Sequence, residues 1–218
     1  ILFHQSLKLV DIYICQNSYQ QQRMKKIFPK KKVLKFYNPI DTSFKKYNFK
    51  RSYIAWVGIF QKQKNLSALL SIAIKLSNYK FMVAGEELES IDSETSEILK
   101  LIKKLNNVEF VGMLSRDEIF IFLSKAHCLL NTSHYEGFPN TYLEAISVRT
   151  PIITRKITDP DNIITNNRLG VCADSFDEIP TLIKNIINKK YNFGDFQHYL
   201  QENHDASNLA TKLINKIN

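Results

Sequence analysis

Two carboxylates eight positions apart are the residues of this chain whose spacing best predicts a chemical role. Glu136 and Glu144 bracket the segment EGFPNTYLE, in which Gly137 permits a close backbone approach and Pro139 suits the first position of a helix. The free amides and partial positive charge at such a helix start bind phosphate or sugar oxygens. Because each carboxylate can accept hydrogen bonds from a pair of hydroxyl groups, the segment predicts a nucleotide-sugar site.

The elements around this segment place it at the edge of a parallel sheet. The sequence predicts an apolar strand over residues 127–133, a helix over 139–147 and a second apolar strand over 150–154. Ligands of parallel sheets bind beyond the carboxyl ends of the strands. Without this order of elements, two glutamates at this spacing would be an ordinary surface coincidence.

Predicted strands and helices alternate along most of the chain. The other strands are predicted over residues 53–58, 80–85, 108–112 and 169–173, and the other helices over 65–76, 93–105, 115–124, 176–189 and 206–217. Ser115 and Glu118 have the spacing of a capping box at one helix start. This alternation predicts an α/β fold, a Rossmann-like doubly wound parallel sheet of about six strands that is covered on both faces.

The first part of the chain has a different organisation. An apolar strand is predicted over residues 11–15, a polar helix over 19–28, and a second strand over 32–41 that ends in a turn at Asn38-Pro39. We therefore divide the chain into three predicted parts, which are residues 1–41, a basic linker over 42–50, and a larger domain over 51–218. The chain opens on apolar residues without a Met, which favours a piece of a longer protein.

The positive charge is concentrated in residues 23–51. This segment holds eleven Lys or Arg residues against one acidic residue, Asp41, so the rest of the chain is close to neutral although the net charge is +9. An anionic lipid surface, an anionic acceptor or a nucleic acid could each be its partner, and a merely solvated face is the simplest alternative. No run of about 18 apolar residues and no secretory signal are found, so we expect a cytoplasmic protein.

Metal and redox chemistry have weak support. The three cysteines, Cys15, Cys128 and Cys172, match no metal or redox spacing, so free thiols in a reducing cytoplasm are expected. Asp159 and Asp161 have a spacing that can hold a metal ion, but the intervening proline makes an ordinary loop the favoured interpretation.

Further candidates lie at the predicted strand ends. Gly58 ends one strand, and Lys64 in the following loop can reach a diphosphate oxygen as a point charge, although an ordinary surface lysine is the alternative. Gly85 ends the next strand, and Gly112 with Met113 follows the one after that. These later loops are where a base could stack or bond to the backbone.

Together these segments resemble the C-terminal half of a GT-B glycosyltransferase of family 4, a retaining and nucleotide-sugar-dependent group. NPID (residues 38–41) is similar to the interdomain segment of that family, and VGIFQKQKN (57–65) is similar to its phosphate loop. VAGEE (83–87) and VEFVG (108–112) match two further strand ends. The segment over 136–154 matches the Glu-x7-Glu motif and the strand after it.

The resemblance implies a role for each matching residue. Glu136 would be catalytic and would contact the transferred sugar, Lys64 would bind the diphosphate, and Glu144 would hold the ribose. Backbone amides of Phe138, Asn140 and Thr141 would hold sugar or phosphate oxygens. The implied donor-binding set is Gly58, Lys64, Gly85, Gly112, Met113, Gly137, Phe138, Pro139, Asn140, Thr141 and Glu144.

The resemblance also implies partners and the absence of a cofactor. The donor would be a UDP- or GDP-sugar and the acceptor a glycan or lipid-linked molecule, in cell-surface polysaccharide synthesis. No metal is expected, because amides and cations stabilise the leaving diphosphate. The basic charge of residues 23–51 fits an anionic membrane surface, so the inner face of the membrane is the expected place, and no nucleic acid is expected. Residues 1–41 would be the remnant of an N-terminal acceptor domain.

Two departures from the family pattern bear on activity. Ile59 stands where the family has an arginine, and Arg149 stands where it has a glycine; Lys62 does not match the missing position. A charge-assisted contact contributes roughly 1.5–3 kcal/mol, so diphosphate affinity would be lower by about 10- to 100-fold. Because residues 1–41 would be only a remnant of the N-terminal acceptor domain, we expect donor binding without full activity from this chain.

Three alternative functions remain open from the sequence. The first is a nucleotide-sugar-binding module without catalysis, for which Ile59 is the motive. The second is a GT-B-like sugar-nucleotide epimerase. The third is a nucleic-acid-binding α/β protein that uses residues 23–51, which steep salt dependence of binding would reveal.

Overall fold

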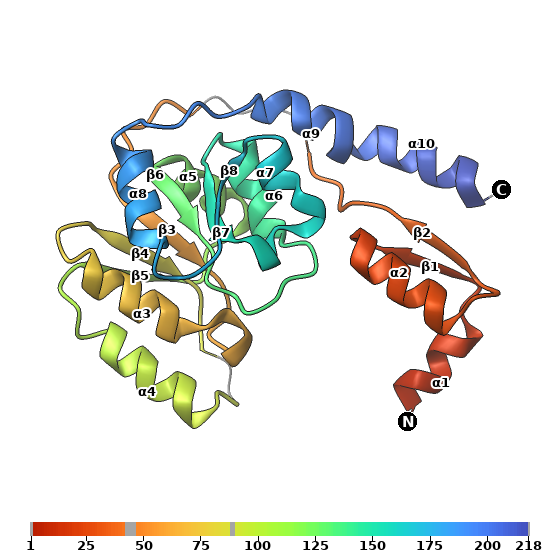
Figure 1. Ribbon diagram of the computed structural model, residues 1–218, viewed down its shortest axis with the longest axis horizontal. Coiled ribbons are helices and arrows are strands. Elements are labelled where there is room, and N and C mark those ends of the chain that lie inside the picture. Colours follow the sequence, from red (N-terminus) through yellow and green to blue (C-terminus); the bar gives the residue numbers. More distant parts are fainter. Residues whose placement is uncertain (1, 42–46, 88–89, 218) are drawn as a thin grey trace.

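The computed structural model describes residues 2–41, 47–87 and 90–217, and these form two separate parallel sheets (Figure 1). The larger sheet has six strands in the order β5-β4-β3-β6-β7-β8. Its strands are β3 Tyr53–Val57, β4 Phe81–Ala84, β5 Val108–Gly112, β6 Ala126–Leu130, β7 Ile152–Arg155 and β8 Gly170–Ala173. All five pairings are parallel, so the predicted doubly wound α/β fold is confirmed.

Helices cover both faces of this sheet because its strands are apolar on both sides. Within β3, Ile54 and Trp56 join one buried core, whereas Tyr53 and Ala55 join the other. The first core is closed by α3 Leu66–Lys75, α4 Ser93–Ile102 and α8 Ile179–Ile187. The second is closed by α5 Arg116–Ser124, α6 Asn140–Ser147, α7 Ile163–Asn166 and α9 Phe196–His204.

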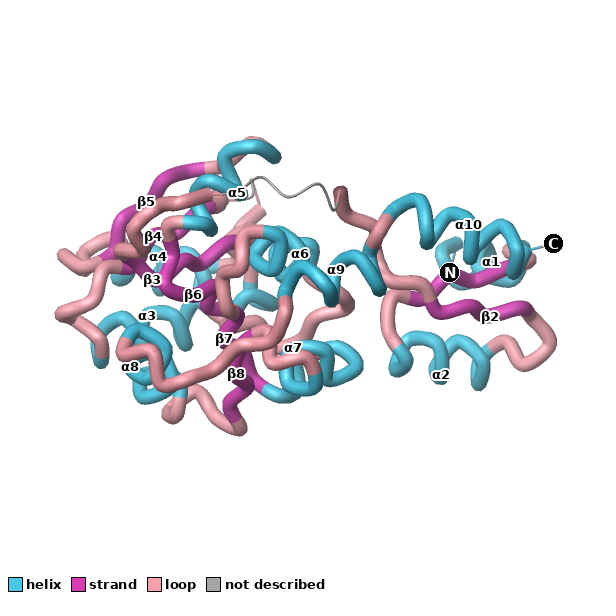
Figure 2. The backbone as a smooth tube through the Cα atoms, turned by 90° about the horizontal axis from the view of Figure 1, so that it is seen from above, coloured by secondary structure: helices cyan, strands magenta, loops and turns pink. Residues whose placement is uncertain are grey.

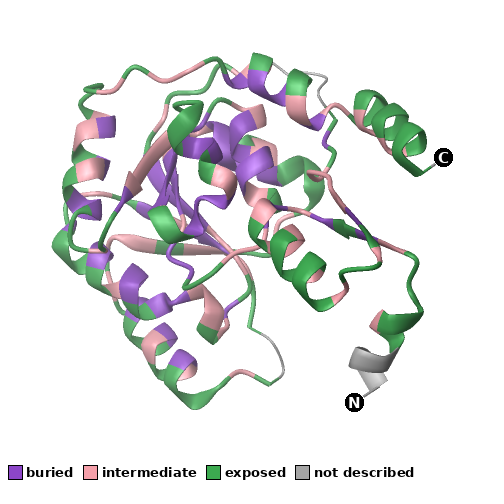
Figure 3. Ribbon diagram, turned by 45° about the vertical axis from the view of Figure 1, so that its right-hand side comes forward, coloured by how far each residue is buried: buried purple, intermediate pink, exposed green. Residues whose placement is uncertain are grey.

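The smaller sheet pairs β1 Ile12–Cys15 with β2 Lys32–Lys35. Figure 2 shows α2 Ser18–Ile27 on one side of it, and α1 Leu2–Leu9 with α10 Ala206–Ile217 on the other. Among the described side chains, the buried core of this part comprises Tyr13, Cys15 and Val33. Burial is therefore concentrated around the larger sheet, while α10 is mostly exposed (Figure 3).

The chain passes between the two sheets twice, and the passages lie side by side. The Ile40 amide donates to the carbonyl oxygen of His204 over 3.0 Å. The His204 ring is buried, with Nδ1 2.8 Å from the Asn38 carbonyl oxygen, and its centroid lies 5.3 Å from the ring of Tyr37 and 5.3 Å from that of Phe138. Burial lowers the pKa of His204 to about 4, so this junction is a neutral aromatic cluster.

Several predicted boundaries are wrong by a few residues. The strand predicted to end at residue 133 ends at Leu130, because the polar residues that follow turn toward the neighbouring loop. Pro139 is the N-cap of α6 rather than its first residue, with ψ at 125°. Helix α9 was not predicted, since its sequence is polar on most positions and only its Asp195 cap marks the start.

One local prediction, the capping box, is confirmed. Ser115 and Glu118 form the predicted capping box at the start of α5. Cys15, Cys128 and Cys172 are free thiols. None of the helices in the described ranges combines the length and apolarity that crossing a bilayer requires.

Candidate functional site

Lys64 and Glu136 are carried by the two loops that flank the reversal of strand order. Lys64 ends a short 3-10 helix, Lys62–Lys64, after β3, and Glu136 lies in the loop after β6. The strands β3 and β6 are neighbours, but the next strands along the chain lie on opposite sides of them. In doubly wound sheets the loops diverge at this point and leave the crevice in which ligands bind.

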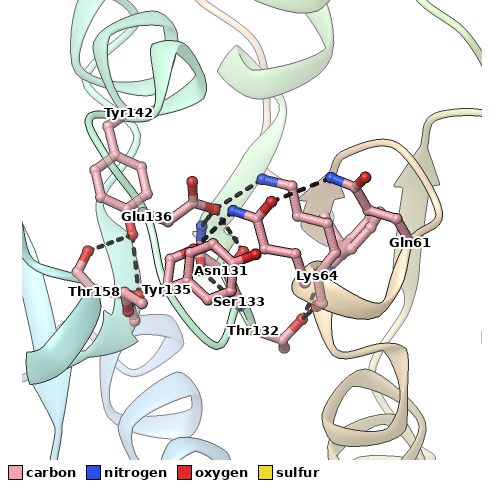
Figure 4. A network of polar contacts seen from close by, with 12 residues as sticks. Gln61, Lys64, Asn131, Thr132, Ser133, Tyr135, Glu136, Tyr142 and Thr158 are labelled. Carbon is pink, nitrogen blue, oxygen red and sulfur yellow. Dashed lines mark hydrogen bonds and ion pairs between the residues drawn. The ribbon is translucent and has the colours of Figure 1, made fainter. Parts of the chain in front are cut away.

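The side chains of Lys64 and Glu136 point toward each other between these two loops (Figure 4). Lys64 Nζ lies 2.8 Å from Glu136 Oε1, and the Glu136 side chain is 7% exposed against 20% for Lys64. The same carboxylate oxygen accepts hydrogen bonds from Ser133 Oγ at 2.5 Å and from Asn131 Nδ2 at 3.2 Å. Three donors on one oxygen fix the position of this carboxylate.

Hydrogen bonds also join the two loops that carry Lys64 and Glu136. Thr132 Oγ1 donates to the Lys64 carbonyl oxygen over 2.7 Å and accepts from Trp56 Nε1 over 2.9 Å. The His134 amide donates to the Gln63 carbonyl oxygen over 2.9 Å. The loop after β3 and the loop after β6 are therefore joined by hydrogen bonds around the Lys64–Glu136 pair.

Helix α6 begins directly after the loop that carries Glu136. Asn140 and Thr141 are its first residues, and the first amides of a helix have no partner within it. The Phe138 ring is buried against the Tyr37 ring at a centroid distance of 5.3 Å. Tyr142 anchors the helix from inside, since its hydroxyl donates to the Thr158 carbonyl oxygen over 3.1 Å.

Glu144 lies within α6, in surroundings that differ from those of Glu136. It lines a cavity of about 180 Å³ together with Pro39, Ile40, Arg116, Phe120, Asn140 and Leu143. Burial raises the pKa of Glu144, and the positive charge of Arg116 opposes this increase. Pro39 and Ile40 of the first chain passage form part of its wall, and the lining combines a carboxylate, a guanidinium and the first turn of α6.

A second cavity lies at the carboxyl ends of β3, β4 and β5. It has a volume of about 170 Å³, and its lining includes Gly58, Gly85 and Met113, as well as Ile59. A side chain at residue 85 would place Cβ 1.9 Å from the Gly58 carbonyl oxygen, so only glycine permits this approach of two strand ends. Gly112, the last residue of β5, has a φ of +75°.

Some candidates have structural partners instead. Lys62 forms an exposed ion pair with Glu94 at 3.3 Å. The carboxylate of Asp159 accepts from the Ile164 and Thr165 amides at the start of α7. Among the described residues no cluster of three or more His, Cys, Asp or Glu side chains is arranged to hold a metal ion.

The basic segment is not one free face. Lys35 Nζ lies 2.8 Å from Asp161 Oδ2, and the Ser18 amide donates to Asp161 Oδ1 over 2.8 Å. Arg51 donates to the Arg149 carbonyl oxygen over 2.6 Å. Five of the eleven basic residues thus have partners within the molecule, namely Arg23, Lys31, Lys32, Lys35 and Arg51, and Lys45 and Lys46 lie outside the described residues.

Sequence reasoning missed three residues of the site. Asn131 and Ser133 hold Glu136, but the predicted strand over 127–133 included them. The signal that could have found them is the run of polar side chains that follows the apolar strand. Arg116 faces the Glu144 cavity, and it was treated only as part of a helix start. No sequence pattern links Arg116 to Glu144, because the contact depends on the packing of α5 against α6.

The chain is similar to proteins that are named as glycosyltransferases. It is 26% identical over 186 residues to the O-antigen chain mannosyltransferase RfbU of Salmonella typhimurium, over 84% of this chain and 52% of that protein. It is 26% identical over 141 residues to the capsular polysaccharide biosynthesis glycosyltransferase CapM of Staphylococcus aureus, over 62% of this chain and 36% of that protein. This chain therefore spans about half of RfbU and about a third of CapM.

The fold is shared with solved glycosyltransferase-like structures. The crystal structure of Anabaena Alr3699/HepE in complex with UDP-glucose matches with a TM-score of 0.80 and 14% identity, over 95% of this chain and 64% of that one. At this identity the match shows the fold alone. The family model described as glycosyl transferases group 1 matches residues 39–206, and the chain therefore belongs to that family.

Proposed function

We propose that this chain binds a nucleotide-sugar donor in the crevice between β3 and β6, and that the whole protein transfers the sugar to a glycan or lipid-linked acceptor with retention of configuration. The observation that supports this most is the contact of Lys64 Nζ with Glu136 Oε1 at 2.8 Å. It brings a cation and a carboxylate from two separate loops to the one point of the sheet where ligands of this fold bind.

In this proposal the diphosphate lies between Lys64 and the start of α6. The Lys64 ammonium supplies a point charge, and the first amides of the helix supply hydrogen-bond donors. Together they stabilise the negative charge that develops on the leaving diphosphate. No metal ion or cofactor is part of the proposed mechanism.

Glu136 acts on the transferred sugar. Its carboxylate is held by Ser133 and Asn131, so it keeps its place when Lys64 turns to the diphosphate. The freed lone pairs then accept hydrogen bonds from sugar hydroxyls and stabilise positive charge at the reacting carbon. Such stabilisation is effective because the carboxylate is positioned before the donor binds.

The nucleoside occupies the two cavities beyond the phosphate site. Glu144 holds the ribose hydroxyls, and the base lies against Gly58, Gly85 and Met113 at the strand ends. We favour a UDP-sugar, because the Anabaena Alr3699/HepE structure of the same fold contains UDP-glucose. The names of RfbU and CapM support a role in cell-surface polysaccharide synthesis.

The exposed basic residues define the proposed place of action. Arg23, Lys25 and Lys26 are exposed on α2, and Lys30 and Lys32 are exposed after it. Clustered cations of this kind bind anionic lipid surfaces or anionic acceptors. We therefore place the protein in the cytoplasm, on the inner face of the membrane.

A nucleotide-sugar-binding module without catalysis is the second candidate, and Ile59 supports it. The Ile59 side chain is 41% exposed beside the strand-end cavity, where a cation would otherwise stand. A missing cation lowers affinity for the diphosphate and weakens stabilisation of the leaving group. The two candidates differ in the sugar-transfer activity of the full-length protein. An enzyme would have this activity and lose it in Glu136→Ala, whereas a binding module would have none.

Titration calorimetry with UDP-, GDP- and ADP-sugars tests donor binding by this chain. We expect one nucleotide class to bind, and Lys64→Met to weaken its affinity by about 10- to 100-fold, because a charge-assisted contact is lost. The matched control is Lys62→Met, which removes a neighbouring cation that is paired with Glu94 and should leave affinity unchanged. Absence of binding by all three classes would contradict the proposal.

A further inference from the structure

Asn17 connects the smaller sheet to the loop that carries Glu136. It is the N-cap of α2 and is 5% exposed. Its Oδ1 accepts from the Gln20 amide over 2.8 Å, and its Nδ2 donates to the Gly137 carbonyl oxygen over 2.8 Å. The two contacts fix the orientation of the side-chain amide, because each end has the partner that its chemistry requires.

The Gly137 loop lies directly against the start of α2. A Cβ at residue 137 would lie 3.0 Å from Gln20 Nε2 and 3.3 Å from Gln16 Oε1. A second polar connection runs from Gln16 Nε2 to Asn38 Oδ1 over 2.8 Å, and from Asn38 Nδ2 to Asn140 Oδ1 over 2.7 Å. Side chains from outside the larger sheet therefore hold the segment over 137–140 at both ends.

The carbonyl group of Gly137 and the amide of Phe138 belong to one peptide group. No cis peptide bond occurs among the described residues, and in a trans peptide the C=O and N–H point in opposite directions. The bond from Asn17 to the Gly137 oxygen therefore sets the direction of the Phe138 N–H, which points away from Asn17. The Phe138 amide is one of the groups assigned above to sugar or phosphate oxygens.

The geometry points to Asn17 as a positioning residue, which fixes the Glu136 loop and aims the Phe138 amide from the smaller sheet. Capping α2 does not by itself require asparagine, because Ser, Thr and Asp cap a helix about as well. Asparagine differs from these in having an N–H donor beside the capping oxygen, and this donor makes the contact with Gly137. The consequence for donor binding rests on the proposed function, whereas the positioning of the loop does not.

Two variants separate positioning from capping. Asn17→Asp keeps the capping oxygen and replaces the donor with an acceptor, and Asn17→Ser keeps a shorter capping oxygen without adding charge. We expect both to unfold at nearly the wild-type denaturant midpoint. Hydrogen exchange of the amides over residues 137–141 should become about five- to tenfold faster, and affinity for UDP-glucose should fall by a similar factor, as for one lost hydrogen bond.

The matched control is Asp92→Asn, which exchanges the same two groups at the N-cap of α4, where the capped partner is Thr95 rather than a residue in contact with the Glu136 loop. It should change neither exchange at residues 137–141 nor affinity. The inference is overturned if hydrogen exchange at residues 137–141 is unchanged in both Asn17 variants. It is also overturned if affinity falls only in a variant whose unfolding midpoint has shifted. If wild-type protein binds no nucleotide sugar, the proposed function fails, but the exchange rates still decide whether Asn17 positions the loop.

Discussion

The regions around Glu136 and Glu144 differ in how far their polar groups are already paired. Glu136 is 7% exposed and its Oε1 has three donors, one of which is the Lys64 ammonium. Glu144 lines an open cavity of about 180 Å³, in which Arg116 is the nearby cation, and burial raises its pKa. The comparison teaches that one carboxylate is fixed before a ligand arrives, whereas the other has room to receive one.

Lys64→Met should produce the largest effect, because it leaves Glu136 largely buried without its cation. Removal of one partner from a buried ion pair costs about 3–5 kcal/mol, and the partial exposure of Lys64 lowers the expected loss to about 2–4 kcal/mol. The measurement is the free energy of unfolding from denaturant titration followed by circular dichroism.

Two further variants show whether this loss comes from the unpaired carboxylate. Lys62→Met removes a cation from the exposed pair with Glu94 and should cost only about 0.2–1 kcal/mol. The double variant Lys64→Met with Glu136→Gln should recover most of the loss, since no unpaired charge remains. If Lys62→Met and Lys64→Met lower the free energy of unfolding equally, the Lys64–Glu136 pair stabilises the protein no more than an exposed ion pair does.

Glu144→Gln should affect ligand binding more than stability. The carboxamide fills the same space but cannot form charge-assisted bonds with ribose hydroxyls, so affinity for the bound nucleotide should fall by about tenfold. Glu136→Gln should leave affinity for the free nucleoside unchanged, since Glu136 is assigned to the sugar. Calorimetry with a nucleoside, a nucleoside diphosphate and a nucleotide sugar distinguishes these two outcomes.

The same variant gives a pH test of the Glu144 region. A carboxyl group whose pKa is raised by folding binds its proton more tightly in the native state, so it lowers stability as the pH rises from the unfolded value, about 4.3, through the folded one. Wild-type protein should show this decline in the free energy of unfolding, and Glu144→Gln should not. Glu109→Gln, at an exposed ion pair with Lys80, is the control. Parallel pH curves for wild type and Glu144→Gln would refute the burial effect.

The difference between the two regions also explains what the sequence could predict. The alternation of apolar strands and amphipathic helices is local, so the order of elements, the six-stranded fold and the loops with Lys64 and Glu136 were predictable. The partners Asn131 and Ser133 were hidden by a strand predicted three residues too long. Arg116 and Asn17 reach the site through tertiary packing between distant segments, for which no local pattern exists. The assigned domain boundaries and donor-binding roles stay predictions.

Ile59→Arg extends the comparison to the strand-end cavity, which Ile59 lines. Ile59 is exposed beside Gly58 and Gly85, so an arginine there can extend toward the crevice without displacing a core side chain. One additional charge-assisted contact should raise affinity for a nucleoside diphosphate by about tenfold or somewhat more and leave affinity for the nucleoside unchanged. Ile74→Arg, at an exposed position of α3, is the control for added charge. An equal gain in both variants would mean that net charge, rather than a contact in the crevice, strengthens binding.

Arg149→Gly should produce the smallest effect, because it acts on the end of the helix that carries Glu144. Arg149 has a φ of +56° after α6, and the Thr150 amide donates to the Ala145 carbonyl oxygen over 2.8 Å, as in a helix terminus that favours glycine. A left-handed conformation costs a side-chain-bearing residue about 1–2 kcal/mol, so glycine should stabilise the protein by about 0.5–1 kcal/mol.

Lys189 provides a matched position at the end of α8, with a φ of +55° and the Lys190 amide bonded to the Asn185 carbonyl oxygen over 2.9 Å. Lys189→Gly should stabilise the protein by a similar amount, since the strain that it removes is the same. Only Arg149→Gly should slow hydrogen exchange in the last turn of α6, next to Glu144, because the two helices end at different places in the fold. Stabilisation by Lys189→Gly alone would show that the contacts of the Arg149 side chain, such as the 3.3 Å bond from Nη2 to Gln197 Oε1, offset the backbone strain.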